Sequence, residues 1–299
     1  APTLTALQGF SIGAGKTLAI KVDANAYTLD KNQKIALLKA ANLVTRYPLN
    51  TITYSVTDPH YGVMRYQLVY ETESESGMDV LKLESLQAKP IYLTGMDGTD
   101  VASCSFTAGA NWSNKLPPGP GTNYIVSGSN RLLRCRSASA TFSGDSLTVA
   151  NFGDFAINSS PCRVDNLRLG ASGILSTRSQ GEQILRGTND VISVTNRPFE
   201  FQIEDNSGIH REQRALKVES AFKGPGDVVF RCYAYSSTGG RYTLAALSPD
   251  FTGGIAVQQD GIYLCFSNQL CLGGSAANFR ADRLAIRNSA VVRFLGDVT

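Results

Sequence analysis

The chain has two histidines among its 299 residues, His60 and His210, and neither lies in a recognisable catalytic or metal-binding pattern. Histidine carries much of the acid–base and metal chemistry that proteins perform near neutral pH. The six cysteines include no C-x-x-C pair, which argues against a zinc site and leaves open whether they form disulfides or remain free thiols. The sequence therefore assigns no catalytic, cofactor-binding or metal-binding residue, and we expect no enzyme activity.

Charge and long apolar stretches are also scarce. Charged residues make up 18% of the chain, below the usual quarter, and no apolar run reaches the roughly 18 residues that a membrane-spanning helix needs. From residue 130 onward, 16 arginines and 2 lysines accompany 15 acids. The tightest basic group is Arg131, Arg134 and Arg136, which we interpret as ion-pairing or interface residues. A nucleic-acid-binding protein usually has a larger basic excess, so contact with nucleic acid is not indicated.

What the sequence does contain is many short apolar segments separated by turns, typical of β-strands. The segment Leu116–Gly121 holds three prolines and two glycines and interrupts any regular element. We expect a mainly β protein with an antiparallel sandwich or barrel architecture and two β-rich regions, residues 1–116 and 122–299.

One helix is predicted near the N-terminus, over residues 31–46. Asp30 offers an N-cap, Ile35, Leu38 and Leu43 form an apolar stripe, and Pro48 ends the element. Downstream, alternating segments at 51–56 and 63–71 and the run after the acidic turn 71–77 indicate a long hairpin over residues 51–86.

Two tetrapeptides resemble a known enzyme family. Gly144–Leu147 (GDSL) is similar to the nucleophile block of the GDSL/SGNH hydrolases, and Gly187–Asp190 (GTND) is similar to their oxyanion block. The resemblance implies Ser146 as nucleophile, Gly153 and Asn189 as oxyanion-hole donors, and His210 as base. The chain departs from the family at Ser207, where the family has an aspartate three residues before its histidine, and strands replace the family's alternating strands and helices.

Three weaker patterns were weighed. Segment 260–265 (DGIYLC) resembles the D-x-G-x-Y-x-C strand of immunoglobulin variable domains, which implies Cys232 as a disulfide partner of Cys265. Segment 13–17 (GAGKT) approaches the phosphate-loop pattern, but Phe10 stands where the first glycine belongs, so we interpret it as a turn. A set of tyrosines could face a sugar or a partner, although core packing is the favoured interpretation: Tyr66, Tyr70, Tyr233, Tyr235 and Tyr242.

These features favour a non-enzymatic structural subunit of an assembled particle, and the best single hypothesis is a virion protein (coat, decoration or tail). The expected partners are copies of the chain itself and other particle proteins, with no cofactor and no membrane span. The alternative is a secreted or cell-surface adhesin that binds glycan or protein, in an extracellular location. A GDSL-like serine hydrolase is the remote alternative.

Overall fold

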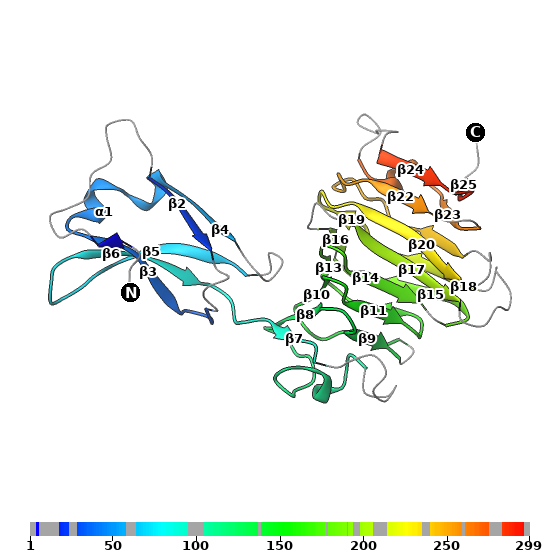
Figure 1. Cartoon of the computed structure of the whole chain (residues 1–299), viewed down its shortest axis with the longest axis horizontal. Helices are drawn as coiled ribbons and strands as arrows, with labels where there is room; N and C mark the ends of the chain where they lie inside the picture. Colours follow the sequence, from blue (N-terminus) through cyan, green and yellow to red (C-terminus); the bar gives the residue numbers. More distant parts are fainter. Residues whose placement is uncertain are drawn as a thin grey trace. The chain divides into compact units, whose positions relative to one another are not determined.

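The computed structural model of the chain describes residues 4–5, 18–23, 29–57, 64–94, 105–136, 139–177, 179–189, 191–193, 198–205, 214–234, 240–258, 261–274 and 283–295. It divides into two compact units, Ala1–Pro90 and Ile91–Thr299 (Figure 1). The segment Leu116–Gly121, which the sequence suggested as a boundary, lies inside the second unit. Among the described residues, no helix has the length and apolarity required to cross a membrane.

The first unit contains a four-stranded mixed sheet and a separate parallel pair. The sheet has the order β1 (Leu4–Thr5), β3 (Lys34–Ala40), β6 (Asp79–Ser85), β5 (Tyr66–Thr72), and the pair is β2 (Leu18–Asp23) with β4 (Ile52–Thr57). A short helix, α1 (Leu43–Arg46), and a 3-10 turn, η2 (Leu49–Thr51), connect β3 to β4. Apolar side chains from both sheets form a single core that includes Leu38, Leu81 and Leu83.

The predicted helix over residues 31–46 is wrong for most of its length, because Lys34–Ala40 is the strand β3 and only Leu43–Arg46 is helical. A β-bulge explains the misleading pattern. The pairing of β3 with β6 shifts register between Ala36 and Leu38, so that Ile35 and Leu38 lie opposite Leu83 and Leu81. The extra residue places two side chains three positions apart on the same face, and this spacing imitates one turn of a helix.

The predicted hairpin is confirmed in part. β5 and β6 form an antiparallel hairpin, with Thr72 opposite Asp79, joined by the acidic turn. The earlier strand β4 does not extend this hairpin, because it pairs in parallel with β2, with Leu18 opposite Ile52. The hairpin therefore covers the second half of the predicted range.

The second unit is a coil of parallel strands. Each of the central turns of chain adds one strand to each of three sheets, and each strand pairs with the strand one turn earlier (Figure 1). The first sheet contains β7 (Ile91–Tyr92), β8 (Asn123–Ser127), β10 (Ser146–Ala150), β13 (Leu167–Leu169), β16 (Val191–Ser193) and β19 (Phe222–Lys223). The second contains β9 (Leu132–Cys135), β11 (Asp154–Ile157), β14 (Ile174–Thr177), β17 (Phe199–Asp205), β20 (Val228–Ala234), β22 (Ile255–Gln258) and β24 (Leu284–Arg287). The third contains β12 (Cys162–Arg163), β15 (Gly181–Arg186), β18 (Arg214–Val218), β21 (Arg241–Leu244), β23 (Tyr263–Phe266) and β25 (Val291–Phe294). The described part of the unit also contains two 3-10 turns, η3 (Gly109–Asn111) and η5 (Gln269–Leu272).

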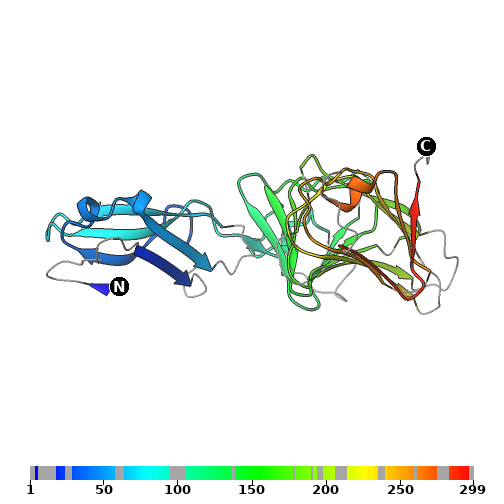
Figure 2. The same ribbon diagram turned by 90° about the horizontal axis from the view of Figure 1, so that it is seen from above.

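The prediction of a mainly β chain is confirmed, and the prediction of antiparallel pairing is wrong for this unit: every strand pair that the structure describes in the three sheets is parallel. Viewed from above, the sheets surround a core that apolar side chains fill (Figure 2). This winding is a parallel β-helix, in which each turn buries its apolar residues against the turns on either side.

The core is built from columns of side chains at equivalent positions of successive turns. One column in the second sheet is buried from its first member to its sixth, and its members are Leu133, Phe155, Leu175, Phe201, Phe230, Val257 and Ile286.

Glycine is required where turns approach closely. At Gly153, an added Cβ would lie 2.5 Å from the carbonyl oxygen of Val126, so any side chain there would force the two turns apart.

The two ends of the coil differ. At the first turn, Phe106 and Trp112 are fully buried against the core, and the Trp112 ring lies 4.8 Å from that of Tyr124 in an edge-to-face arrangement. The Trp112 indole donates to the carbonyl oxygen of Phe106 at 3.1 Å. At the last turn, the inward-facing residues Ile286 and Phe294 are 50% and 45% exposed. Within the described residues, the core is therefore covered at its first turn and exposed at its last.

Candidate functional site

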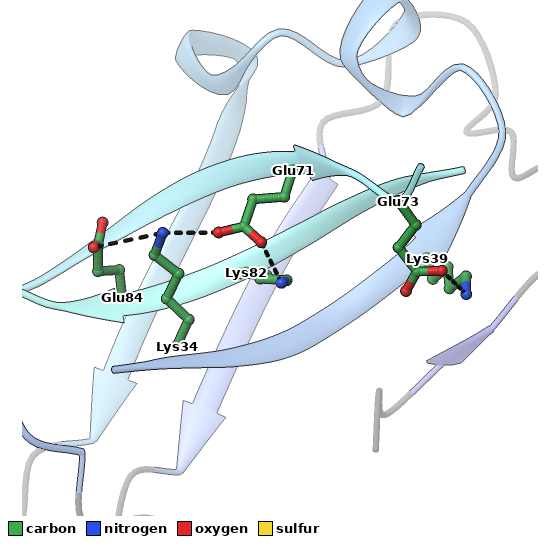
Figure 3. Close-up of polar contacts among 6 residues, drawn as sticks. All are labelled: Lys34, Lys39, Glu71, Glu73, Lys82 and Glu84. Atoms are coloured by element: carbon green, nitrogen blue, oxygen red, sulfur yellow. Dashed lines mark hydrogen bonds and ion pairs between the residues drawn. The ribbon is translucent and has the colours of Figure 1, made fainter. Parts of the chain in front are cut away.

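The most organised group of charges in the first unit lies on the face of the four-stranded sheet that points away from the core (Figure 3). Lys34 Nζ lies 2.7 Å from Glu71 Oε1 and 3.8 Å from Glu84 Oε1. Glu71 uses its other carboxylate oxygen to pair with Lys82. These four residues come from three adjacent strands. They face the same side of the sheet because alternate residues of each strand do so. They form a continuous ionic row across β3, β6 and β5.

A further pair extends this group toward the hairpin turn. Lys39 pairs with Glu73, and the Ser76 hydroxyl donates to the same Glu73 oxygen at 3.1 Å. We call the six charged residues the ionic face: Lys34, Lys39, Glu71, Glu73, Lys82 and Glu84. Three ammonium groups meet three carboxylates, so the face carries no net charge. It is not a surface for a strongly acidic or strongly basic partner.

The ion pairs alter the protonation of their members. Hydrogen bonds from Lys34 and Lys82 lower the pKa of Glu71 from 4.5 to about 2. The bond from Lys39, with that from Ser76, lowers the pKa of Glu73, and the bond to Glu71 raises the pKa of Lys34. The carboxylates of Glu71 and Glu73 are thus held charged by lysines and have no role as proton donors near neutral pH. The described residues also contain no group of three or more His, Cys, Asp or Glu that could hold a metal ion.

Acid should weaken the hairpin through Glu71. Because the pKa of Glu71 in the folded protein, about 2, lies below its ordinary value of 4.5, its contribution is complete above pH 4.5 and is lost as the pH falls toward 2. We expect amide hydrogen exchange in β5 and β6 to accelerate over this interval in low salt. The effect should be small, because the pairs are exposed and screened by water.

Glu71→Gln should remove most of this pH dependence, since the amide cannot titrate. Glu75→Gln is the matched control, because Glu75 lies in the same hairpin turn and has no ion pair within the described part of the chain. Equal pH profiles for wild type and Glu71→Gln would contradict the assignment.

The hydrolase-like residues do not come together in the described structure. Ser146 is buried at the start of β10, and its hydroxyl donates to Asn123 Oδ1 at 2.7 Å, in the strand one turn earlier. Gly153 lies beyond the opposite end of β10, in the tight turn already described. Asn189 is exposed after β15, and His210 lies outside the described residues. Ser146 therefore acts as a link between successive turns of the coil.

Of the tyrosines that could face a sugar or a partner, those whose side chains the structure describes pack in the cores. The Tyr242 side chain is fully buried, and its hydroxyl donates to the carbonyl oxygen of Phe201 at 2.9 Å. Tyr70 donates to the Tyr47 carbonyl oxygen at 2.9 Å, and burial raises the pKa of Tyr70 to about 12. Tyr66 packs against the core of the first unit. The side chains of Tyr233 and Tyr235 lie outside the described set.

The arginine group of the first coil turn also has structural contacts. Arg131 donates to the Thr94 carbonyl oxygen. Arg134 is buried in β9, where its backbone forms an isolated parallel bridge with Ser105. Arg136 likewise takes part in an interaction. These contacts lie within the protein itself, and the interpretation of the three arginines as ion-pairing or interface residues stays a prediction.

The remaining sequence patterns separate into two groups. Cys232 in β20 and Cys265 in β23 are free thiols on different sheets of the coil, so the disulfide implied by the immunoglobulin resemblance is absent. Cys135, Cys162 and Cys271 are also free and buried, whereas Cys104 lies outside the described residues. The phosphate-loop-like segment 13–17 and His60 fall outside them as well.

Sequence analysis missed the ionic face, although a signal was present. Lys82 and Glu84 alternate with buried leucines in β6, and Gln67 and Glu71 occupy the outward positions of β5. The strand β3 was not predicted, and a helix over residues 31–46 would not bring Lys34 beside Glu71.

Comparison with known proteins adds no relative. The chain matches no family model, no curated protein and no solved structure.

Proposed function

We propose that this protein is a non-enzymatic structural subunit of an assembled particle, with a virion protein (coat, decoration or tail) as the preferred class. Its partners in this proposal are copies of itself and other particle proteins, and its location is the virion. The observation that carries the proposal is the outer edge of β5, the last strand of the sheet in the first unit, along which no other described strand pairs. A free strand edge is a template for pairing with another chain.

Hydrogen bonding within the hairpin defines that edge. Glu73 N–H donates to the Met78 carbonyl oxygen, and Leu86 N–H donates to that of Arg65. Antiparallel pairs alternate between hydrogen-bonded and non-bonded residues. Leu68, Tyr70 and Thr72 therefore direct their peptide N–H and C=O groups away from β6. These groups, with the balanced ionic face beside them, are suited to strand pairing with a neutral or mixed-charge partner.

The coil supports the same proposal through what its polar residues do. Ser146 and Arg131 are engaged in contacts between neighbouring segments, and the interior is filled by apolar columns. Stacked turns of this kind provide a long, stiff surface rather than a deep pocket. Such a surface is suited to contacts with other protein chains, as a subunit of an assembled particle requires.

The edge can be blocked at Thr72. Thr72→Pro removes an N–H that points away from β6, and proline is tolerated at an edge strand in that orientation. We expect wild type to form large species in sedimentation velocity, and we expect the variant to remain folded by circular dichroism but to form none of them. Thr72→Val is the matched control: it keeps the N–H and removes only the hydroxyl that donates to Asp79 Oδ1.

Assembly that survives Thr72→Pro would show that β5 is not the contact. A wild-type chain that stays monomeric at every concentration and binds a glycan or a host protein would instead support the secreted or cell-surface adhesin.

A further inference from the structure

We propose that the open end of the coil binds an extended protein segment with alternating apolar and acidic side chains, which adds as the next strand beside β25. This surface, here called the open end, consists of β24, β25 and Leu295. It belongs to the second unit and is independent of the β5 edge on which the proposed function rests.

The first observation is the interrupted core. Phe294 ends a column of inward-facing residues in the third sheet that is buried at every earlier turn: Cys162, Leu185, Val218, Leu244 and Phe266. Its ring meets that of Phe266 edge to face at 5.8 Å, so Phe294 is held in its inward position although almost half of it is exposed. Ile286 in β24 is likewise half exposed at the end of its own column. A strand added beside β25 would cover Phe294, and a full further turn of the coil would also cover Ile286.

The second observation is the state of the backbone at the outer edge of β25. Val291 and Leu295 donate their N–H groups to the carbonyl oxygens of Ile262 and Phe266, one turn earlier. Because the direction of the peptide groups alternates along a strand, Val292 and Phe294 present theirs to the open side. No described strand pairs there. The edge therefore offers donors and acceptors directly beside the exposed ring of Phe294.

The third observation is charge. From Arg283 to Leu295 the chain has three arginines and no acidic residue. Arg293 lies on the outward side of β25, with its guanidinium 5.2 Å from the centre of the Tyr263 ring. Arg287 is exposed on the outward side of β24. Neither forms an ion pair within the described part of the chain. A strand added beside β25 would bring its outward residues beside Arg293, which favours carboxylates there.

The coil already uses this arrangement between its own strands. In the second sheet, Glu200 of β17 and Arg231 of β20 are paired at 3.3 Å on the outward side, while Phe201 and Phe230 stack inside. In the third sheet, Arg241 reaches Glu182 at 2.9 Å. The segment Phe199–Asp205 (FEFQIED) therefore has the pattern expected of the added strand, with apolar residues inward and carboxylates outward.

Surface area favours strand addition over end-to-end contact of two copies. Val291, Ile286, Phe294 and Leu295 are each roughly half exposed, and at about 150–250 Å² for a large side chain they leave about 500 Å² of apolar surface at most. A stable protein interface needs about 800 Å² from each partner. Two copies would also bring like-charged arginines together. An added strand makes up the difference with main-chain hydrogen bonds.

The test uses the full chain and a labelled peptide of sequence FEFQIED with blocked ends, in fluorescence anisotropy. We expect saturable binding, which Arg293→Glu should weaken at least about tenfold, as expected for loss of a close charge pair. A peptide with lysine in place of both glutamates should bind wild type about tenfold more weakly and recover affinity on Arg293→Glu. Arg65→Glu, in the other unit, should bind like wild type.

A second pair of probes tests the strand geometry without altering the protein. The peptide is methylated on the backbone nitrogens of either its odd or its even residues, and a strand pairs through one of these sets only. One methylated peptide should therefore bind and the other should fail. The proposal is overturned if wild type shows no saturable binding at about 1 mM peptide, if both methylated peptides bind equally, or if Arg293→Glu changes nothing. A dimer that the peptide cannot dissociate would also overturn it, in favour of a second copy at this end.

Discussion

Replacing Phe201 with alanine should destabilise the coil by about 3–5 kcal/mol, the usual cost of truncating a buried aromatic side chain. Phe201 is fully buried at the middle of its column. Its ring stacks on Phe230 at 5.0 Å and meets Phe199 and Phe222 at 5.4 and 5.8 Å. Because a parallel coil is tightly packed between turns, the surrounding residues can fill the cavity only in part. For a unit of this size, the loss corresponds to a fall in Tm of roughly 10 °C.

Fluorescence of Trp112 provides the measurement, since it is the sole tryptophan and is buried at the first turn of the same unit. Phe152→Ala is the matched control: Phe152 lies in the turn after β10 and is 58% exposed, so its loss should change Tm by little. If both variants melt within a degree of each other, the column does not stabilise the coil as described.

Leu38→Asp should unfold the first unit and leave the coil intact. Leu38 is buried in β3 opposite Leu81, and a carboxylate there would have no partner within the core. Burial of an unpaired charge costs several kcal/mol, a large share of the stability of a small unit. Hydrogen exchange should reach the unprotected limit in β3, β5 and β6, while Trp112 fluorescence stays native, because the two units have separate cores.

Ala40→Asp distinguishes the strand from a helix. In β3, Ala40 is fully buried on the same face as Leu38, whereas a helix would turn it about 200° away, toward the opposite side. We expect Ala40→Asp to be as damaging as Leu38→Asp. Leu86→Asp is the control, since Leu86 is exposed just after β6. A folded Ala40→Asp protein would contradict the register of β3.

Local pattern predicted the strands well where one face is buried and the partner is close in sequence. The hairpin of β5 and β6 follows from the alternation of apolar and polar residues around the turn Glu73–Gly77. The pattern failed at β3, because a bulge displaced the alternation by one residue and imitated a helical stripe. A bulge is set by the pairing with β6 and leaves no separate mark on the sequence of β3 itself.

The pairing direction of the coil was beyond the sequence. Alternating segments separated by turns look the same whether each strand folds back on its predecessor or passes to the next sheet. Leu175 pairs with Phe155, 20 residues earlier, and with Phe201, 26 residues later, and nothing in the segment around Leu175 specifies those partners.

By itself, the sequence determined that the chain is rich in β-strands, that Tyr66, Tyr70 and Tyr242 pack in the cores, and that the chain is poor in the residues of acid–base and metal chemistry. These properties depend on composition and on period-two alternation, which are local. Only the tertiary structure decided that the strands of the second unit are parallel, that Ser146 bonds to Asn123 rather than to a histidine, and that the core is open at Ile286 and Phe294. Each of these depends on contacts between residues some 20 or more positions apart. Such contacts are selected by the stability of the complete fold, because no single segment contains the information that specifies them.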